Sequence, residues 1–330
     1  MMPSLRDARI PHPREHLYLA CSTICNLGCQ ICPYRKGVLP RQVMSHARFA
    51  SVIDQACELG FEAFGLTPLI GEVFTDRQFL EKLRYLEAHP GVKSYSFITN
   101  FTLGVGEFIA ALNGLKKLRY MSISVYGHDE LSFIQATGST DRVWEALLTN
   151  LLTLARTLPP APVRTQVRIR SQSGMTENTC APGLRKALEA LRARNVPVKF
   201  PQHYYNWGGL IAEEEVEPLD VTFLPSPPRS GPCTMIFYKT IVLPDGRVNA
   251  CACRDAGATL VIGDLERQTL REIFSSRNPI YARLIEEQSN GIFGAVCQAC
   301  NMYRSPHDPH ETYDRHLKPP ITLSQFFEQF

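Results

Sequence analysis

The sequence predicts an α/β protein in which a partial (β/α)6, TIM-like barrel is followed by a small β-hairpin/helix domain. Short apolar runs alternate with amphipathic segments between residues 16 and 200, which is typical of parallel βαβ units with right-handed crossovers. Beyond an acidic, Pro-rich stretch the pattern changes to a hairpin with short helices. Four cysteines lie within residues 21–32 and five within 233–300, so each part carries a cysteine group.

Six runs are predicted as strands, which is too few to close an eight-stranded barrel. They are His16–Cys21, Ala63–Thr67, Lys93–Thr99, Tyr120–Val125, Val163–Arg170 and Pro197–Phe200. Between them, apolar periodicity predicts helices over Ala47–Gly60, Phe79–Ala88, Gly106–Leu112, Trp144–Leu158 and Leu184–Arg194. In a barrel of this kind, the active site is expected at the carboxyl ends of the strands.

The remaining chain divides into smaller parts. We expect an N-terminal extension over 1–15, the barrel over 16–212, a linker over 213–230, the second domain over 231–304 and a polar tail over 305–330. In the second domain, Ile236–Val242 and Arg247–Ala252 flank a Pro-Asp-Gly turn and predict a hairpin. Helices are predicted over Leu270–Ile273 and Ile280–Glu287.

The composition narrows the class of protein. The chain has 330 residues and a formal net charge of +3, too small and dispersed to indicate a nucleic-acid partner. No apolar run approaches the ~18 residues of a membrane span, and the N-terminus has no apolar signal segment. We therefore expect a cytoplasmic protein with no membrane partner, where eleven cysteines indicate metal binding rather than disulfides.

The first cysteine group follows the first predicted strand with the spacing Cys25-x3-Cys29-x2-Cys32. Three thiolates are one short of a closed zinc site, but they can hold an iron–sulfur cube with one iron left open. A zinc knuckle with Cys21 as the fourth ligand is the alternative, as is a shifted spacing that uses Cys21 and omits Cys32. The segment CNLGCQICPY resembles the signature of the radical S-adenosylmethionine (SAM) superfamily.

This resemblance implies a barrel that holds a SAM-binding [4Fe–4S] cluster. In the superfamily the open iron binds the amino and carboxylate groups of SAM, and one electron cleaves SAM to methionine and a 5′-deoxyadenosyl radical. That radical removes a hydrogen atom from the substrate. The electron implies a cytosolic partner, a one-electron reductant of the flavodoxin or ferredoxin type.

Further segments resemble the SAM-binding motifs of the superfamily and fall after successive predicted strands. LTPLIGEVF resembles the Gly-Gly-Glu motif with one glycine replaced by Ile70, and ISVYGHDE resembles the Ser-x-Asp-Gly segment with Tyr126 in place of the Asp. Arg168 and Arg170 are two residues apart on the fifth predicted strand, so their side chains lie on the same face. If that face points inward, an arginine there can pair with the SAM carboxylate. The residues expected at SAM are Ile31, Gly71, Glu72, Thr99, Asn100, Ser124 and Arg168.

The second cysteine group contains Cys233, Cys251, Cys297 and Cys300, which together can close a metal site. By spacing alone, zinc and an iron–sulfur cube fit equally. Residues 231–302 resemble the twitch domain, the short form of the SPASM domain that follows many radical SAM barrels. The resemblance implies an auxiliary [4Fe–4S] cluster and hence two [4Fe–4S] clusters in the chain.

Cys253 is surplus to both ligand sets. It lies two residues from Cys251, on the same face of an extended segment. It is an alternative ligand, a packed thiol, or a hydrogen-atom donor that quenches a substrate radical, with the nearby cluster helping to restore the thiol. Cys21, Cys57 and Cys180 are expected to be structural.

The resemblance extends to twitch-type enzymes that act on aminocyclitols and aminoglycoside sugars. The sequence therefore predicts a small-molecule or carbohydrate substrate that is epimerised at a carbinol carbon, with Cys253 as the hydrogen donor. Dehydrogenation of the carbinol to a ketone, with the auxiliary cluster as electron acceptor, is one alternative, and maturation of a ribosomal peptide is another. The run HYYNWGG near the predicted barrel mouth suits sugar faces and hydroxyls. Its candidate substrate residues are His203, Tyr204, Tyr205, Asn206 and Trp207.

Overall fold

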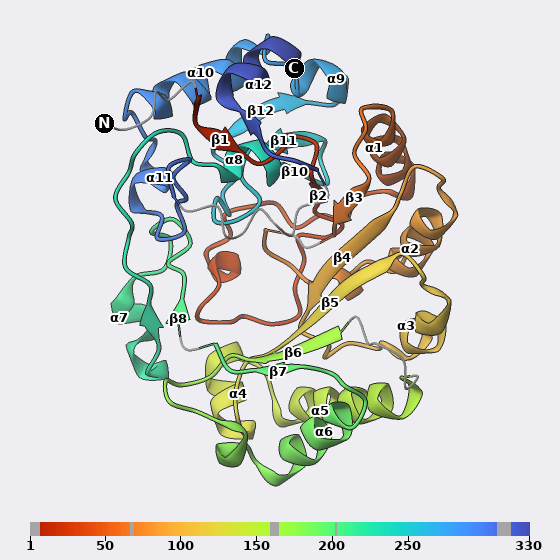
Figure 1. Cartoon of the computed structure of the whole chain (residues 1–330). Coiled ribbons are helices and arrows are strands. Elements are labelled where there is room, and N and C mark those ends of the chain that lie inside the picture. Colours follow the sequence, from red (N-terminus) through yellow and green to blue (C-terminus); the bar gives the residue numbers. More distant parts are fainter. Residues whose placement is uncertain (1–6, 67–68, 159–164, 202, 309–317) are drawn as a thin grey trace.

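The computed structural model describes residues 7–66, 69–158, 165–201, 203–308 and 318–330. Its centre is a nine-stranded sheet with the order β12-β11-β10-β2-β3-β4-β5-β6-β7. Strands β2 to β7 are parallel and adjacent in sequence order, which confirms the predicted partial barrel (Figure 1). Their bounds are β2 (Leu17–Leu19), β3 (Ala63–Gly65), β4 (Ser94–Thr99), β5 (Leu118–Val125), β6 (Thr165–Ile169) and β7 (Val198–Lys199).

The five predicted barrel helices all form and lie outside the curved sheet (Figure 1). They are α1 (His46–Glu58), α2 (Phe79–Ala88), α3 (Gly106–Ala111), α5 (Asp141–Thr157) and α6 (Pro182–Arg192). A further helix in the barrel region, α4 (Glu130–Thr137), was not predicted. Asp129 caps it by accepting a hydrogen bond from Ser132 N, and it ends at Gly138 with φ +63°. The N-cap aspartate and the C-terminal glycine were the signals for it.

The two faces of the barrel wall differ in character. Side chains such as Phe64, Ile123 and Val167 are buried against the helices. Because strand residues alternate between faces, their neighbours point to the barrel interior. There Ser122 Oγ donates to the Gln166 amide oxygen at 3.3 Å, and Arg168 Nη2 donates to Tyr120 OH at 3.3 Å. The barrel is therefore apolar on its outer face and polar inside.

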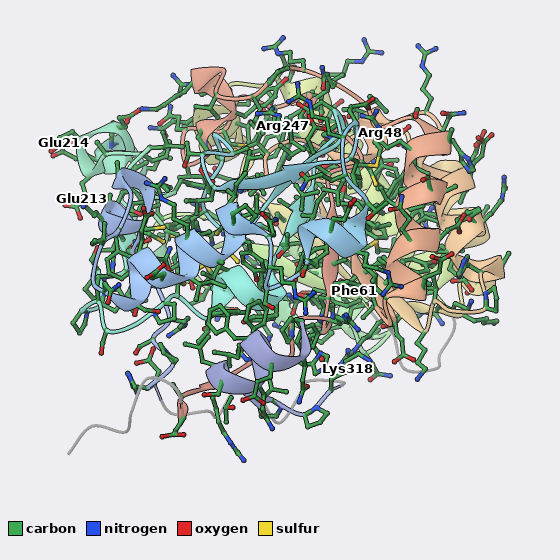
Figure 2. The ribbon with its side chains drawn as sticks, turned by 90° about the horizontal axis from the view of Figure 1, so that it is seen from above. Arg48, Phe61, Glu213, Glu214, Arg247 and Lys318 are labelled. Carbon is green, nitrogen blue, oxygen red and sulfur yellow. The ribbon has the colours of Figure 1, made fainter. Side chains whose placement is uncertain are left out.

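The second domain continues the same sheet. β10 (Ile241–Val242) pairs in parallel with β2, and β11 (Arg247–Asn249) and β12 (Val261–Asp264) follow antiparallel. The β10–β11 hairpin is as predicted, but the prediction that its first strand begins at Ile236 is wrong. There the chain forms α8 (Met235–Tyr238), because Ile236 N bonds to Cys233 O in a helical turn. Arg48 on α1 bonds to Pro244 O and pairs with Glu266, which fastens the barrel to the hairpin. Figure 2 labels Arg48 beside α1.

The tail, predicted only as polar, is structured over its described part. β13 (Ile321–Thr322) pairs antiparallel with β1 (Arg9–Ile10), and α12 (Leu323–Gln329) follows. The remaining helices are α7 (Glu213–Val216), α9 (Leu270–Ile273), α10 (Pro279–Ser289) and α11 (Ala295–Ala299), and β8 (His203–Tyr204) pairs with β9 (Thr222–Phe223) apart from the main sheet. Among the described residues, no helix has the length and apolar character needed to cross a membrane.

Packing of α12 gives a stability prediction. Phe326 is fully buried, with ring centroids 5.4 Å from Phe237 and 5.7 Å from Tyr281, whereas its neighbour Phe327 is 46% exposed. We expect Phe326→Ala to lower the free energy of unfolding by about 3–5 kcal/mol. The matched Phe327→Ala variant should lose less than about 1 kcal/mol. Denaturant titrations of both variants measure this, and equal losses would contradict the docking of α12.

Candidate functional site

The loop that carries the first cysteine group lies in the middle of the barrel ring (Figure 1). Backbone bonds hold it from two sides, because Gly28 N and Gln30 N donate to Thr137 O and Ala136 O at the end of α4. On the opposite side, Glu72 N donates to Ile24 O at 2.7 Å. The loop is thus fixed between the ends of β3 and α4.

The thiols of Cys25, Cys29 and Cys32 form one set. They lie close enough to affect one another electrostatically, and burial raises the pKa of Cys25 to about 12 and that of Cys32 to about 11. Cys21 does not join them, since it is fully buried in the core between sheet and helices, near Lys82 and Asp76. A buried thiol loses its proton when it binds a metal, because the metal takes the place of the proton. The set therefore has the chemistry of a three-thiolate site.

The Gly71-Glu72 and Thr99-Asn100 segments meet beside this loop. Thr99 Oγ1 donates to Glu72 Oε1 at 2.6 Å, Asn100 N donates to Oε2 at 2.6 Å, and Asn100 Nδ2 reaches Cys25 Sγ at 3.8 Å. Gly71 has φ +123°, and a Cβ there would lie 2.4 Å from Ser22 O, so only glycine fits. The structure therefore brings four of the predicted SAM residues together around Cys25.

Glu72 is a buried carboxylate without a charged partner. Burial raises its pKa to about 7 despite the donated hydrogen bonds, and no ion pair involves it among the described residues. A carboxylate held this way retains acceptor capacity for a further donor, such as an amino group. This is the first feature of the site that fits SAM.

The second feature of the site that fits SAM is a cavity on the other side of the loop. Ile31, Tyr126, Arg170 and Tyr204 are among its lining residues. Within the described structure, Ser124 Oγ and Arg170 Nε are buried without hydrogen-bond partners, so both can bind ligand oxygens. Of the two strand arginines, Arg170 is close enough to Cys29 and Cys32 to act on them, whereas Arg168 bonds to Tyr120. A SAM contact by Arg168 stays a prediction, and Arg170 is the nearer candidate.

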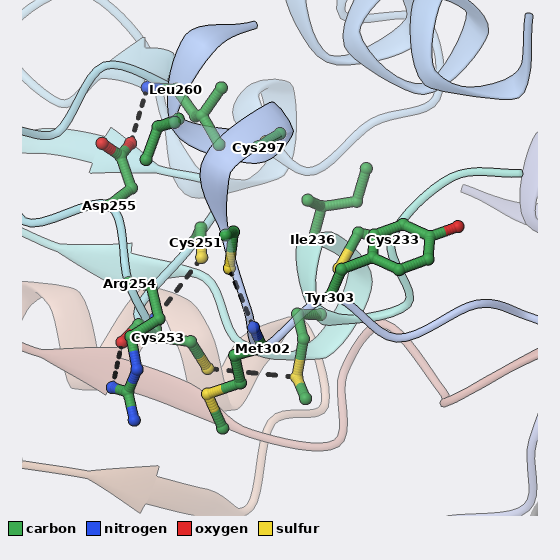
Figure 3. Close-up of a pocket in the computed structure, with 13 residues that line it drawn as sticks. Cys233, Ile236, Cys251, Cys253, Arg254, Asp255, Leu260, Cys297, Met302 and Tyr303 are labelled. Atoms are coloured by element: carbon green, nitrogen blue, oxygen red, sulfur yellow. Dashed lines mark hydrogen bonds between the residues drawn. The ribbon is translucent and has the colours of Figure 1, made fainter. Parts of the chain in front are cut away.

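The second cysteine group lines a separate pocket (Figure 3). Cys233, Cys251, Cys297 and Cys300 come from the turn before α8, the end of the hairpin, and α11. Donors already point at the sulfurs, since Gln288 Nε2 lies 3.5 Å from Cys297 Sγ and Met302 N lies 3.3 Å from Cys300 Sγ. Such N–H···S contacts are typical of iron–sulfur ligands, whose reduction potential they help to set.

Cys253 lines the same pocket as the four cysteines. Its backbone N lies 3.4 Å from Cys251 Sγ, and its own Sγ lies 3.9 Å from Met235 Sδ (Figure 3). Arg254 follows it and stacks on Tyr205 at 4.2 Å and on Trp207 at 4.8 Å. Trp207 Nε1 in turn donates to Ile31 O, next to Cys32, so one stacked group joins the two cysteine sets.

The five candidate substrate residues divide by position. Asn206 Nδ2 donates to Ala299 O at 2.8 Å and so positions the second CxxC, while Tyr204 OH donates to Ser171 O at 3.0 Å. Tyr205 and Trp207 hold Arg254, and His203 is exposed. Asn206 and Arg254 were not expected as links between the domains, because their partners are distant in sequence. Substrate contact by these five residues stays a prediction.

Comparison with known proteins agrees with this geometry. Residues 233–301 match the SPASM family, an iron-sulfur cluster-binding domain. BtrN in complex with AdoMet and 2-DOIA has the same fold, with 14% identity, 92% of this chain and 98% of that chain covered, and a TM-score of 0.57. The protein has the radical SAM fold and a SPASM domain.

Two further solved structures share this fold. SuiB of Streptococcus suis bound to S-adenosylmethionine is 11% identical, with 89% of this chain and 75% of that chain covered and a TM-score of 0.57. Native anSMEcpe with bound AdoMet is 16% identical, with coverages of 83% and 84% and a TM-score of 0.53. No curated protein matches the sequence. The fold, the three-thiol loop and the SPASM domain agree on SAM and iron–sulfur clusters as the cofactors.

Glu72 gives a test of the SAM site. We expect Glu72→Gln to weaken SAM binding about tenfold at pH 8, because a buried charged acceptor is lost. Bound SAM favours the carboxylate form, so wild-type affinity should rise as the pH rises through about 7, the pKa of Glu72. The amino group of SAM also titrates, and the difference between wild type and variant isolates the part due to Glu72.

Anaerobic calorimetry at pH 6, 7 and 8 measures these affinities. Glu81 on α2 is exposed, so Glu81→Gln is the matched control and should bind SAM as wild type does. Parallel pH profiles for wild type and Glu72→Gln would exclude Glu72 from the site.

Proposed function

We propose that this radical SAM protein removes a hydrogen atom from a carbinol carbon of a sugar- or aminocyclitol-type small molecule and epimerises that carbon, with Cys253 as the hydrogen donor. The observation that carries the proposal is the position of Cys253. Its thiol lies in the pocket of the second cysteine set but is a fifth sulfur where a closed cube uses four.

The residues divide the work between two sites. SAM, reduced by one electron at the three-thiol site, supplies the 5′-deoxyadenosyl radical. Glu72, Asn100, Ser124 and Arg170 orient SAM, and Ile31 with Tyr126 keeps water from the adenosine end. Cys233, Cys251, Cys297 and Cys300 hold the auxiliary cluster of [4Fe–4S] type.

The substrate steps balance as follows. A C–H bond of the carbinol breaks homolytically, and the hydrogen atom leaves as 5′-deoxyadenosine. The S–H bond of Cys253 then breaks, and its hydrogen atom forms a C–H bond on the opposite face of the substrate carbon. The resulting thiyl takes one electron, supplied by a flavodoxin- or ferredoxin-type reductant, and one proton from solvent. The substrate thus keeps its oxidation state.

Dehydrogenation to a ketone is the second candidate, and one contact favours it. Cys253 Sγ faces Met235 Sδ within the cluster pocket, a position that also suits a packed thiol. If Cys253 gives no hydrogen, a carbinol radical next to an electron acceptor loses an electron and a proton instead. A peptide substrate is a third outcome, since SuiB, which shares the fold, is described bound to the precursor peptide SuiA.

Anaerobic reconstitution followed by a SAM-cleavage assay tests the proposal. We expect about eight irons per chain and release of 5′-deoxyadenosine when dithionite is added. In D2O, an epimerised product should carry one solvent deuterium at the inverted carbon, because the thiol proton exchanges with solvent. A ketone product without deuterium would identify a dehydrogenase, and bound zinc without cleavage would refute the enzyme.

A further inference from the structure

Four cations are of interest here. Arg170 lines the cavity beside the three-thiol loop, and Arg254 lines the pocket of the second cysteine set. Arg168 is bonded to Tyr120 on β5, and Lys239 is bonded to Tyr18 on β2. None of them forms an ion pair with a carboxylate among the described residues. On the outer surface, by contrast, Lys93 pairs with Glu62 and Arg192 with Glu177.

Lys239 shows this most clearly. Elsewhere the chain buries a lysine, Lys82, and supplies Asp76 at 2.5 Å to balance it. Among the described residues, the three N–H groups of the Lys239 ammonium have one hydrogen-bond acceptor, Tyr18 OH at 2.9 Å, and the rings of Tyr18 and Tyr238 lie within 5.3 Å. Two donors of this partly exposed ammonium therefore remain for a ligand.

The surroundings fix Lys239 in position. A Cβ at Gly65 would lie 2.4 Å from the Tyr18 ring, so glycine at this point of β3 makes room for the tyrosine that holds the lysine. Ala252 N donates to Lys239 O at 2.6 Å, which ties the lysine to the segment that carries Cys253. Lys239 is thus held in place by its neighbours although its side chain is only partly buried.

Arg254 occupies the other side of Cys253. Its guanidinium is clamped between Tyr205 and Trp207, Nη1 bonds to Cys253 O, and Nε is buried without a partner. Figure 3 shows the Arg254 side chain turned away from Cys297, past the Cys253 backbone. Both Arg254 and Lys239 act electrostatically on the Cys253 thiol.

We infer that the substrate carries an oxyanion, a carboxylate or a phosphate, which Lys239 and Arg254 bind on either side of Cys253. The inference rests on the proposed function and narrows its substrate class. A polycationic aminocyclitol would meet like charges here, whereas a sugar acid or sugar phosphate finds free donors from both cations. The oxyanion also fixes which substrate carbon faces Cys253.

The test uses the reconstituted full chain with SAM and four probes: glucuronate, glucose 6-phosphate, glucose and glucosamine. Anaerobic calorimetry should show at least tenfold tighter binding of one or both acidic probes than of glucose or glucosamine, as expected for charge-assisted bonds. Glucuronate and glucose 6-phosphate distinguish a carboxylate from a phosphate. Equal binding of all four probes would overturn the inference.

Variants assign the effect to these residues. Lys239→Met and Arg254→Met should each weaken acidic-probe binding about 10–100-fold, while Lys239→Arg keeps most of it. The matched controls Lys93→Met and Arg283→Met change exposed cations and should bind as wild type does. If the two interior variants shift only the reduction potential of a cluster and leave probe binding unchanged, the cations balance cluster charge and the inference is wrong.

One further measurement separates this inference from the proposed function. SAM cleavage by dithionite, assayed in the same samples without probe, reports on the radical chemistry alone. Wild type without cleavage would contradict the proposed function. Wild type with cleavage but without anion preference would contradict the substrate class only.

Discussion

Cys32→Ala is expected to abolish SAM cleavage and to lower the iron content from about eight to about four per chain. Cys32 belongs to the three-thiol set, and without it the loop keeps two ligands for a cube that needs three. Iron analysis and 5′-deoxyadenosine release measure the loss. The auxiliary cluster should remain, because its four cysteines come from other elements.

Cys21→Ala is the matched control. Cys21 is fully buried among core side chains, so its loss should cost some stability but neither iron nor SAM cleavage. The opposite pattern, with iron lost in Cys21→Ala and kept in Cys32→Ala, would support the shifted cysteine spacing that omits Cys32.

Cys253→Ala should stop epimer formation while SAM cleavage and the iron content stay close to wild type. The variant removes the hydrogen donor but none of the seven proposed ligands. With a substrate that the wild type turns over, no product should carry solvent deuterium. Mass spectrometry of the product measures epimer formation and deuterium content, and iron analysis measures whether the clusters are retained.

Each other result for Cys253→Ala has a distinct meaning. Normal turnover with deuterium incorporation would refute the donor role. Loss of about four irons would make Cys253 a cluster ligand. Cys180 is buried just before α6 and carries no proposed role, so Cys180→Ala is the control and should keep both SAM cleavage and epimer formation.

The barrel could be predicted from the sequence because its signals are local. The alternation of buried and less buried residues predicts strands such as Ser94–Thr99, and apolar residues at helical spacing predict the helices between the strands. The cysteine spacing likewise lies within one loop, so the three-thiol set was evident. Gly71 and Glu72 could be placed because they follow a strand whose end faces that loop.

Other features depended on partners distant in sequence. The hydrogen bonds of Asn206 to Ala299 and of Trp207 to Ile31 exist only once the second domain has docked. The tail read as polar because β13 is two residues long and gains its structure by pairing with β1. The Thr322 and Gln325 capping box was the one local signal for α12.

The pairing of β2 with β10 has a consequence for how the chain is made. Leu19 near the start of the barrel lies opposite Val242 in the second domain, so β2 presents an open sheet edge until that later segment has emerged from the ribosome. At about 5–20 residues per second, synthesis of the intervening chain takes on the order of tens of seconds. Throughout that time a nascent barrel exposes an unpaired strand and the thiols beside it, a state that favours aggregation and oxidation.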